Sequence, residues 1–81
     1  PSGIAIDPLT GLIYVLNDSG KMLLVYNRGG ELNAVALLDK NLFAKPEGIA
    51  FDPNGNLYIS NEQKSQAANI LFFPRQGGSG G

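Results

Sequence analysis

The sequence contains no cysteine, no histidine and no tryptophan. Without cysteine and histidine, it cannot build a disulfide framework, the usual zinc ligand sets, a thiol nucleophile, a Ser-His-Asp system or an imidazole acid or base. Carboxylates, tyrosines and lysines are the groups left for chemistry. The 81 residues, of which 43% are apolar, correspond to one small domain at most.

Charge of either sign is also scarce. Six Lys and Arg residues against seven Asp and Glu residues leave a formal net charge of −1. The basic footprint typical of proteins that bind nucleic acid or an anionic membrane surface is therefore missing. The longest apolar runs, such as Leu12 to Leu16, have five residues, whereas a transmembrane helix needs about 20. We expect no nucleic-acid partner and no membrane span.

An internal repeat runs through the chain. The phrase Pro-Ser-Gly-Ile-Ala-Ile-Asp-Pro at 1–8 returns 45 positions later as Pro-Glu-Gly-Ile-Ala-Phe-Asp-Pro. Residues 12–18 correspond to 56–62 once one residue is dropped from the turn, and residues 23–28 correspond to 70–75. Self-similarity at a fixed period is typical of repeat architectures. The chain therefore reads as two copies of one unit of about 45 residues.

Each unit carries a similar turn after its first apolar run. Pro fixes φ, Asp can bond local N–H groups, and Gly supplies a positive φ, so the pattern predicts a hairpin turn. A pair of carboxylates could also act as general acid and base or bind Ca²⁺. Because the Asp recurs in both units, we favour a structural role for the turn residues, which are Asp7, Pro8, Gly11, Asp52, Pro53 and Gly55.

The rest of the pattern is typical of strands. Apolar runs rich in Tyr, Ile and Val, at 12–16 and 57–60, indicate strands covered on both faces. Further strands are predicted at 21–27 and 31–38, and a spacing of about ten residues leaves no room for helices between them. In the strand at 31–38, we expect one face to carry Leu32, Ala34, Ala36 and Leu38.

Four antiparallel strands in about 45 residues, repeated, predict the blades of a β-propeller. We assign residues 1–44 to a first blade of four strands with its link, and residues 45–76 to a second blade of three strands. The Gly/Ser tract at 77–81 is expected to be an engineered linker or tag. The predicted fold class is all-β, with two propeller blades of four plus three antiparallel strands that assemble into a multi-chain β-propeller.

The phrases at 46–62 and 68–73 resemble the last blades of the bacterial SdiA-regulated propeller family and, more loosely, NHL-type repeats. The resemblance covers nearly all of residues 1–76. It implies the C-terminal part of a longer parent, for which a bacterial exported or periplasmic location is one option and the compartment stays open. No activity follows, because one fold hosts many functions.

Two blades on their own leave apolar surface uncovered. Each blade presents two apolar faces, of which only one is covered by the other blade, and the apolar segment at 70–73 forms an unpaired edge. We therefore expect identical chains to associate. Three copies, giving six blades, form the simplest closed ring; two, four or five copies, or a strand exchange, are the alternatives.

Polar residues at the strand ends form one candidate ligand site. Antiparallel pairing brings the start of one strand beside the end of the next. The resulting oxygen-rich rim would suit Ca²⁺ or a polar ligand, and its members are Glu47, Asn61 and Glu62, with Asn17 and Asp18 in the first unit. The competing interpretation is that these residues are ordinary turn formers and solvated charges.

The leading functional hypothesis is a self-assembling structural scaffold, engineered or truncated, with no catalytic activity and no cofactor. One alternative is a ligand- or Ca²⁺-binding segment of a bacterial propeller protein. A third is part of a metal-dependent hydrolase or lactonase, which would need several carboxylates around one cation.

Overall fold

A computed structural model of the chain describes residues 3–43, 45–63 and 66–75. The elements in these ranges are β1 (Gly3–Ile6), β2 (Ile13–Asn17), β3 (Met22–Tyr26), β4 (Leu32–Leu37), β5 (Pro46–Phe51), β6 (Leu57–Gln63) and β7 (Gln66–Phe73). This part of the chain contains no helix with the length and hydropathy needed to cross a membrane. The predicted linker or tag at 77–81 lies outside the described residues.

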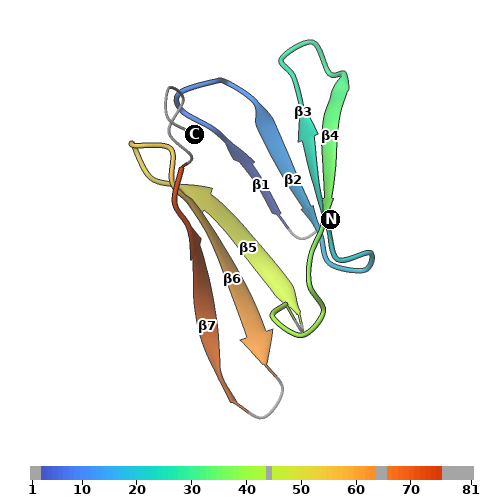
Figure 1. The fold of residues 1–81 in the computed structure, drawn as a ribbon, viewed down its shortest axis with the longest axis vertical. Helices are drawn as coiled ribbons and strands as arrows, with labels where there is room; N and C mark the ends of the chain where they lie inside the picture. Colours follow the sequence, from blue (N-terminus) through green and yellow to red (C-terminus); the bar gives the residue numbers. More distant parts are fainter. Residues whose placement is uncertain (1–2, 44, 64–65, 76–81) are drawn as a thin grey trace.

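The strands form two antiparallel sheets, each in chain order (Figure 1). The first sheet has the order β1-β2-β3-β4 and the second has the order β5-β6-β7. The all-β prediction, with one sheet of four strands and one of three, is therefore confirmed. Each sheet is a meander, because strands that follow one another in the chain also lie next to one another in the sheet.

The turns after β1 and β5 are built alike. Gly11 and Gly55 have φ of 78° and 83°, a region in which an L side chain is strained and Gly is not. The Gly11 N–H donates to the Asp7 carbonyl at 2.8 Å, and the Gly55 N–H donates to the Asp52 carbonyl at 3.0 Å. The repeated Asp and Gly thus close equivalent hairpins in the two sheets.

One face assignment was wrong, because β4 carries a bulge. The register shifts between Val25 and Tyr26, so that Ala34 lies opposite Val25 while Leu32 lies opposite Tyr26. An extra residue in one strand reverses the alternation of side chains beyond it. Leu32 therefore does not share the face of Ala34 and Ala36, as simple alternation had predicted.

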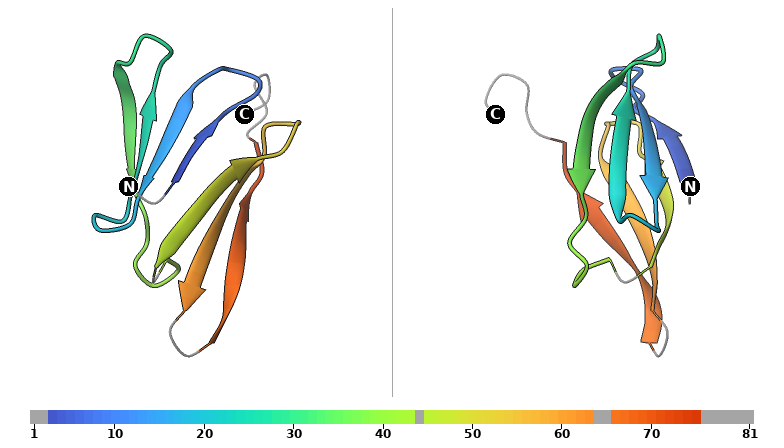
Figure 2. Two further views of the ribbon diagram at one scale, coloured as in Figure 1. Left: turned by 180° about the vertical axis from the view of Figure 1, so that it is seen from behind. Right: turned by 90° about the vertical axis from the view of Figure 1, so that its right-hand side faces the viewer.

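The two sheets pack face to face, and their backbones approach each other most closely at β1, β2 and β5. β1 and β2 contact β5, and β4 and β7 lie at the outer sides of the molecule (Figures 1 and 2). The buried core between the sheets consists of Leu16, Leu23, Phe43 and Ile59, with Ile49 and Leu71 among the side chains packed against it. Phe43 belongs to the segment between β4 and β5, here called the link. Its ring stacks on that of Phe73, with the ring centroids 6.0 Å apart.

The opposite face of each sheet is uncovered. The register places the outward-pointing side chains of the first sheet on its far face, here called the first outer face: Ile4, Ile6, Leu32, Val35 and Leu37. All five are at least half exposed, Ile4 at 67% and Ile6 at 61%. The second outer face is formed by Gly48, Ala50, Tyr58, Ser60, Ile70 and Phe72. Ile70 is 68% exposed.

Candidate functional site

The residues of the predicted ligand rim differ in burial and in hydrogen bonding. Asn61 faces the interior. It lies in β6 and is 1% exposed. Its side-chain oxygen accepts the Lys45 N–H at 2.8 Å, and its side-chain amide donates to the Leu42 carbonyl at 3.2 Å. Both bonds hold the link between the sheets, so Asn61 anchors this link.

Glu47 and Glu62 are exposed. Glu62 Oε1 lies 3.4 Å from the ammonium group of Lys45. Glu47 lies at the irregularity in β5 where the register with β6 shifts between Pro46 and Gly48. Within the described ranges, no three acidic side chains are placed so that they could hold a metal ion together.

The equivalent residues of the first unit, Asn17 and Asp18, build a turn. Asn17 Oδ1 accepts the Ser19 hydroxyl at 2.9 Å and the Gly20 N–H at 3.1 Å. The Asp18 carbonyl accepts the Lys21 N–H at 3.3 Å. The structure therefore gives Asn17 a local bonding pattern, whereas Asn61 bonds to a segment far away in the sequence.

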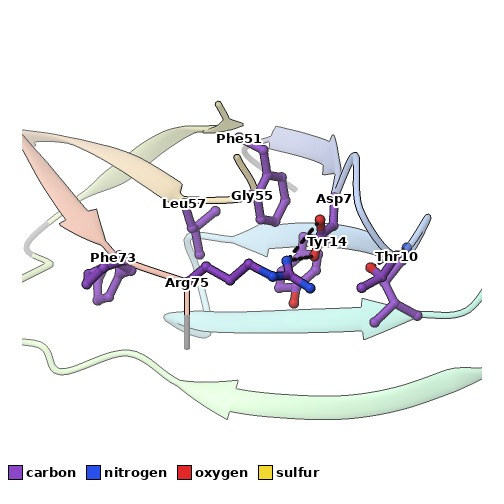
Figure 3. A pocket seen from close by; sticks show the side chains of 10 residues that line it. Asp7, Thr10, Tyr14, Phe51, Gly55, Leu57, Phe73 and Arg75 are labelled. Atoms are coloured by element: carbon purple, nitrogen blue, oxygen red, sulfur yellow. Dashed lines mark hydrogen bonds and ion pairs between the residues drawn. The ribbon is translucent and has the colours of Figure 1, made fainter. Parts of the chain in front are cut away.

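A pocket of about 330 Å³ lies where the two sheets meet. Asp7 and Tyr14 line it from the first sheet and its turn, while Phe51 and Arg75 line it from the second (Figure 3). The Tyr14 and Phe51 rings meet edge to face, with centroids 4.9 Å apart. Arg75 extends beside them toward Asp7 (Figure 3). The sheet-to-sheet junction therefore combines an aromatic contact with a charged one.

Arg75 and Asp7 form an ion pair between the two repeat units. Arg75 Nη1 lies 3.0 Å from Asp7 Oδ2 and 3.3 Å from Oδ1, and Oδ1 also accepts the Leu9 N–H at 2.9 Å. The Asp7 side chain is 4% exposed and that of Arg75 is 34% exposed. A charge-assisted pair of this kind is stronger than a neutral hydrogen bond. It fastens the end of the second sheet to the first turn of the chain.

The pKa of Asp7 reflects opposing effects. Burial acts to raise it, but the hydrogen bonds from Leu9 and Arg75 and the positive charge of Arg75 hold the pKa below the ordinary value of 3.8. The carboxylate is therefore ionised at neutral pH and neutralised by Arg75. The pKa of Tyr14 is raised, first by burial and then by the nearby charge of Asp7. This arrangement suits a fixed joint rather than proton transfer near neutrality.

Asp52, the equivalent of Asp7, lies beside the second outer face. Its Oδ1 accepts the N–H groups of Asn54 and Asn56, both at 2.9 Å. Its Oδ2 accepts the Asn56 amide at 2.9 Å and the Tyr58 hydroxyl at 3.2 Å. The bonds from Asn56 hold the pKa of Asp52 below 3.8. In the part of the chain that the structure describes, Asp52 has no ion pair with an arginine.

The two equivalent arginines occupy matching places on their own turns. A Cβ at Gly55 would lie 2.7 Å from Arg75 Nη1, and a Cβ at Gly11 would lie 2.6 Å from Arg28 Nε. Each guanidinium group therefore lies against the positive-φ glycine of its own unit. Arg75 continues from there to Asp7 of the preceding unit, whereas Arg28 has no preceding unit within the described residues.

Sequence reasoning missed the Arg75–Asp7 pair. A signal was present, because Arg28 and Arg75 repeat at the same place and so do Asp7 and Asp52. The turn Asp was interpreted through its local N–H bonds, or as one of a pair of carboxylates, and not as the partner of a base. The missing step was that a repeated acid and a repeated base can meet between neighbouring units rather than within one unit.

Comparison with known proteins gives one positive finding. The family model described as SdiA-regulated matches residues 2–65, which is most of the chain. No curated protein matches the sequence.

Proposed function

This chain belongs to the SdiA-regulated family, and we propose that it is a self-assembling scaffold in which copies pack sheet against sheet as blades of a shared propeller. Its partner is a second copy of the same chain, and three copies giving six blades would make the simplest closed ring. In this proposal the chain is a structural module rather than an enzyme and uses no cofactor.

One observation carries the proposal: the β1 residues of the first outer face, and the residues of the second outer face, correspond in the repeat to residues of a face that is covered inside the chain. Ile4 and Ile6 of the first outer face correspond to Ile49 and Phe51, which pack against the first sheet. Yet Ile4 and Ile6 are 67% and 61% exposed. Exposed apolar patches of this kind mark interaction surfaces.

The second outer face is matched in the same way. Tyr58 and Phe72 correspond to Tyr14 and Val25 of the covered side of the first sheet. The ring centroids of Tyr58 and Phe72 lie 5.1 Å apart. A second outer face of one copy is thus equipped to receive the first outer face of another. Such head-to-tail contacts close into rings when the rotation between copies allows it.

The free energy gained by covering the outer faces is comparable to the cost of association. Fully burying a large apolar side chain contributes about 1.5–3 kcal/mol. Ile4, Ile6, Ile70 and Phe72 are 67%, 61%, 68% and 52% exposed, so covering what is left of them contributes roughly 4–7 kcal/mol in total. Association costs roughly 4–15 kcal/mol in lost freedom. The apolar faces alone therefore come close to balancing the lower end of the cost, and polar contacts and ring closure decide the outcome.

The experiment compares two lysine substitutions by multi-angle light scattering over a concentration series. Ile6→Lys places a charge on the first outer face, and we expect it to abolish the assembled species. Leu42→Lys is the matched control, because Leu42 lies in the link and is 53% exposed, so the assembled mass should persist. Equal masses for wild type and Ile6→Lys would overturn the proposal.

A further inference from the structure

We infer that copies of this chain join head to tail through an ion pair between Arg28 of one copy and Asp52 of the next, repeating between chains the Asp7–Arg75 pair found within one chain. This inference rests on the proposed self-assembly. It names the charged contact that would direct this assembly.

The first step concerns Arg28. It occupies the repeat position of Arg75, and both guanidinium groups lie against the positive-φ glycine of their own turn. Arg75 uses this position to reach the Asp of the preceding unit, 3.0 Å away. Arg28 is exposed, and its equivalent target would be the Asp of a preceding unit supplied by another copy.

The second step concerns Asp52. It occupies the repeat position of Asp7. Asp7 is 3% exposed because the second sheet covers it, whereas Asp52 is only half-buried. Asp52 Oδ2 accepts bonds from side chains alone, those of Asn56 and Tyr58. Asp52 already accepts four hydrogen bonds, as many as the roughly four lone-pair sites of a carboxylate. An incoming guanidinium would therefore replace the Asn56 or Tyr58 side-chain donor at Oδ2, and the charge-assisted bond that forms is stronger than the neutral bond it displaces.

The apolar contact beside the Asp7–Arg75 pair also has repeat equivalents on the two outer faces. Tyr14 packs on Phe51 inside the chain, and the repeat equivalents of these residues are Tyr58 and Ile6. Half-buried Tyr58 of one copy and exposed Ile6 of the next would therefore meet at the interface between copies.

A contact between a glycine and an isoleucine also has a repeat equivalent on the two outer faces. A Cβ at Gly3 would lie 3.1 Å from Ile49 Cγ2, so the missing side chain makes room for this isoleucine. The equivalent pair is Gly48 on the second outer face and Ile4 on the first. The ion pair, the aromatic position and the glycine all place the second unit of one copy against the first unit of the next.

These contacts single out a second copy as the occupant and fix the orientation. Arg28, Ile4 and Ile6 lie in the first unit, while Asp52, Tyr58 and Gly48 lie in the second. Charge complementarity therefore exists between the first unit of one copy and the second unit of another. Two identical ends face to face would bring Arg28 near Arg28 or Asp52 near Asp52, and like charges at an interface are unfavourable. The interface is heterologous, as ring closure requires.

The test is a double-mutant cycle on association, measured by sedimentation velocity across a concentration series. The variants are Arg28→Ala, Asp52→Asn and their combination. Asp52→Asn removes the charge and keeps a side-chain oxygen for the turn bonds, and circular dichroism checks that each variant retains its β structure. Lys40→Ala is the control, because it removes one exposed positive charge outside the outer faces.

We expect each single variant to weaken association by at least about tenfold, as removing one partner of an interfacial charge pair does. The combined variant should be little weaker than either single one, because one interaction is lost in all three. Lys40→Ala should associate as wild type does.

Two outcomes would overturn the inference in distinguishable ways. If wild type assembles and Arg28→Ala and Asp52→Asn associate equally well, or their effects simply add, the scaffold proposal stands and the Arg28–Asp52 contact is wrong. If wild type itself stays monomeric throughout the series, the scaffold proposal fails and the contact fails with it.

Discussion

Replacement of Arg75 by alanine leaves Asp7 without its counter-charge. Asp7 would then keep the Leu9 N–H as its backbone partner while remaining beneath the second sheet. A buried carboxylate without a counter-charge is strongly unfavourable. We therefore expect Arg75→Ala to destabilise the protein well beyond the loss of an ordinary surface ion pair.

The magnitude follows from the geometry. A hydrogen bond to a charged group contributes about 1.5–3 kcal/mol, and the 34% exposure of the Arg75 side chain allows some screening by solvent. We expect a loss of about 2 kcal/mol. For a domain of this size, 1 kcal/mol shifts Tm by roughly 4–8 °C, so Tm should fall by roughly 8–16 °C.

The pH dependence distinguishes the ion pair from simple loss of packing. The folded-state pKa of Asp7 is held below 3.8, so its contribution to stability is present above that pH and is lost as the pH falls through the folded-state pKa. The stability lost in Arg75→Ala should therefore be full at pH 7 and shrink as the pH falls to about 4 and below. There Asp7 of the variant, which lacks Arg75, takes up a proton before wild-type Asp7 with its lowered pKa does.

The assay is thermal unfolding followed by circular dichroism, with all proteins at one concentration because association shifts Tm. Lys45→Ala is the control, since its partner Glu62 is exposed and the pair has side-chain exposures of 57% and 54%. Its loss should lie within about 1 kcal/mol. A deficit for Arg75→Ala that matches the control, or one that does not change between pH 7 and pH 3, would refute the reasoning.

Three further predictions use other contacts. Asn61→Ala removes both bonds to the link and leaves the Lys45 N–H and the Leu42 carbonyl without these partners; we expect a loss of roughly 2–4 kcal/mol, and an unchanged urea midpoint would contradict this role. Gly55→Ala introduces a Cβ at φ of 83° and 2.7 Å from Arg75 Nη1, so unfolding should require at least about 1 kcal/mol less; a neutral melting curve would count against the turn geometry. Because the chain lacks cysteine, Ile6→Cys and Tyr58→Cys can be mixed and oxidised, and a disulfide between the two different variants is expected; products linking only identical variants would argue for another orientation.

The strand order and the two hairpin turns were accessible from the sequence because they depend on local rules. Asp followed by Pro and then Gly defines a turn through φ preferences and nearby N–H groups, and the repeat shows that the same turn occurs twice. The family assignment rested on the same local phrases, such as Pro46 to Glu62, and the match over residues 2–65 confirms it.

The face of β4 and the place of Asn61 were harder to predict, because both depend on contacts outside their own strand. Nothing local marks the bulge that separates Leu32 from Ala34. Asn at a strand end suggested a ligand rim or an ordinary turn, yet the side chain of Asn61 is buried and bonds to the link. The Arg75–Asp7 pair joins residues 68 positions apart, and only the packing of one sheet on the other brings them together.

The division of the chain into blades at 1–44 and 45–76 stays a prediction of the repeat, as do the absence of catalysis and of a cofactor. The five predicted rim residues have been placed: Asn61 anchors the link, Asn17 and Asp18 make a turn, and Glu47 and Glu62 are exposed. Whether any ligand binds there is answered directly by calorimetric titration with Ca²⁺, for which the scaffold proposal expects no heat.

The most direct measurement is the mass of the native wild-type particle by sedimentation equilibrium at micromolar concentration. Propeller assembly predicts a defined multiple of the 8.6 kDa chain mass, with three copies as the favoured number. A particle of 8.6 kDa that stays folded and melts cooperatively would contradict the claim that the outer faces need a second copy.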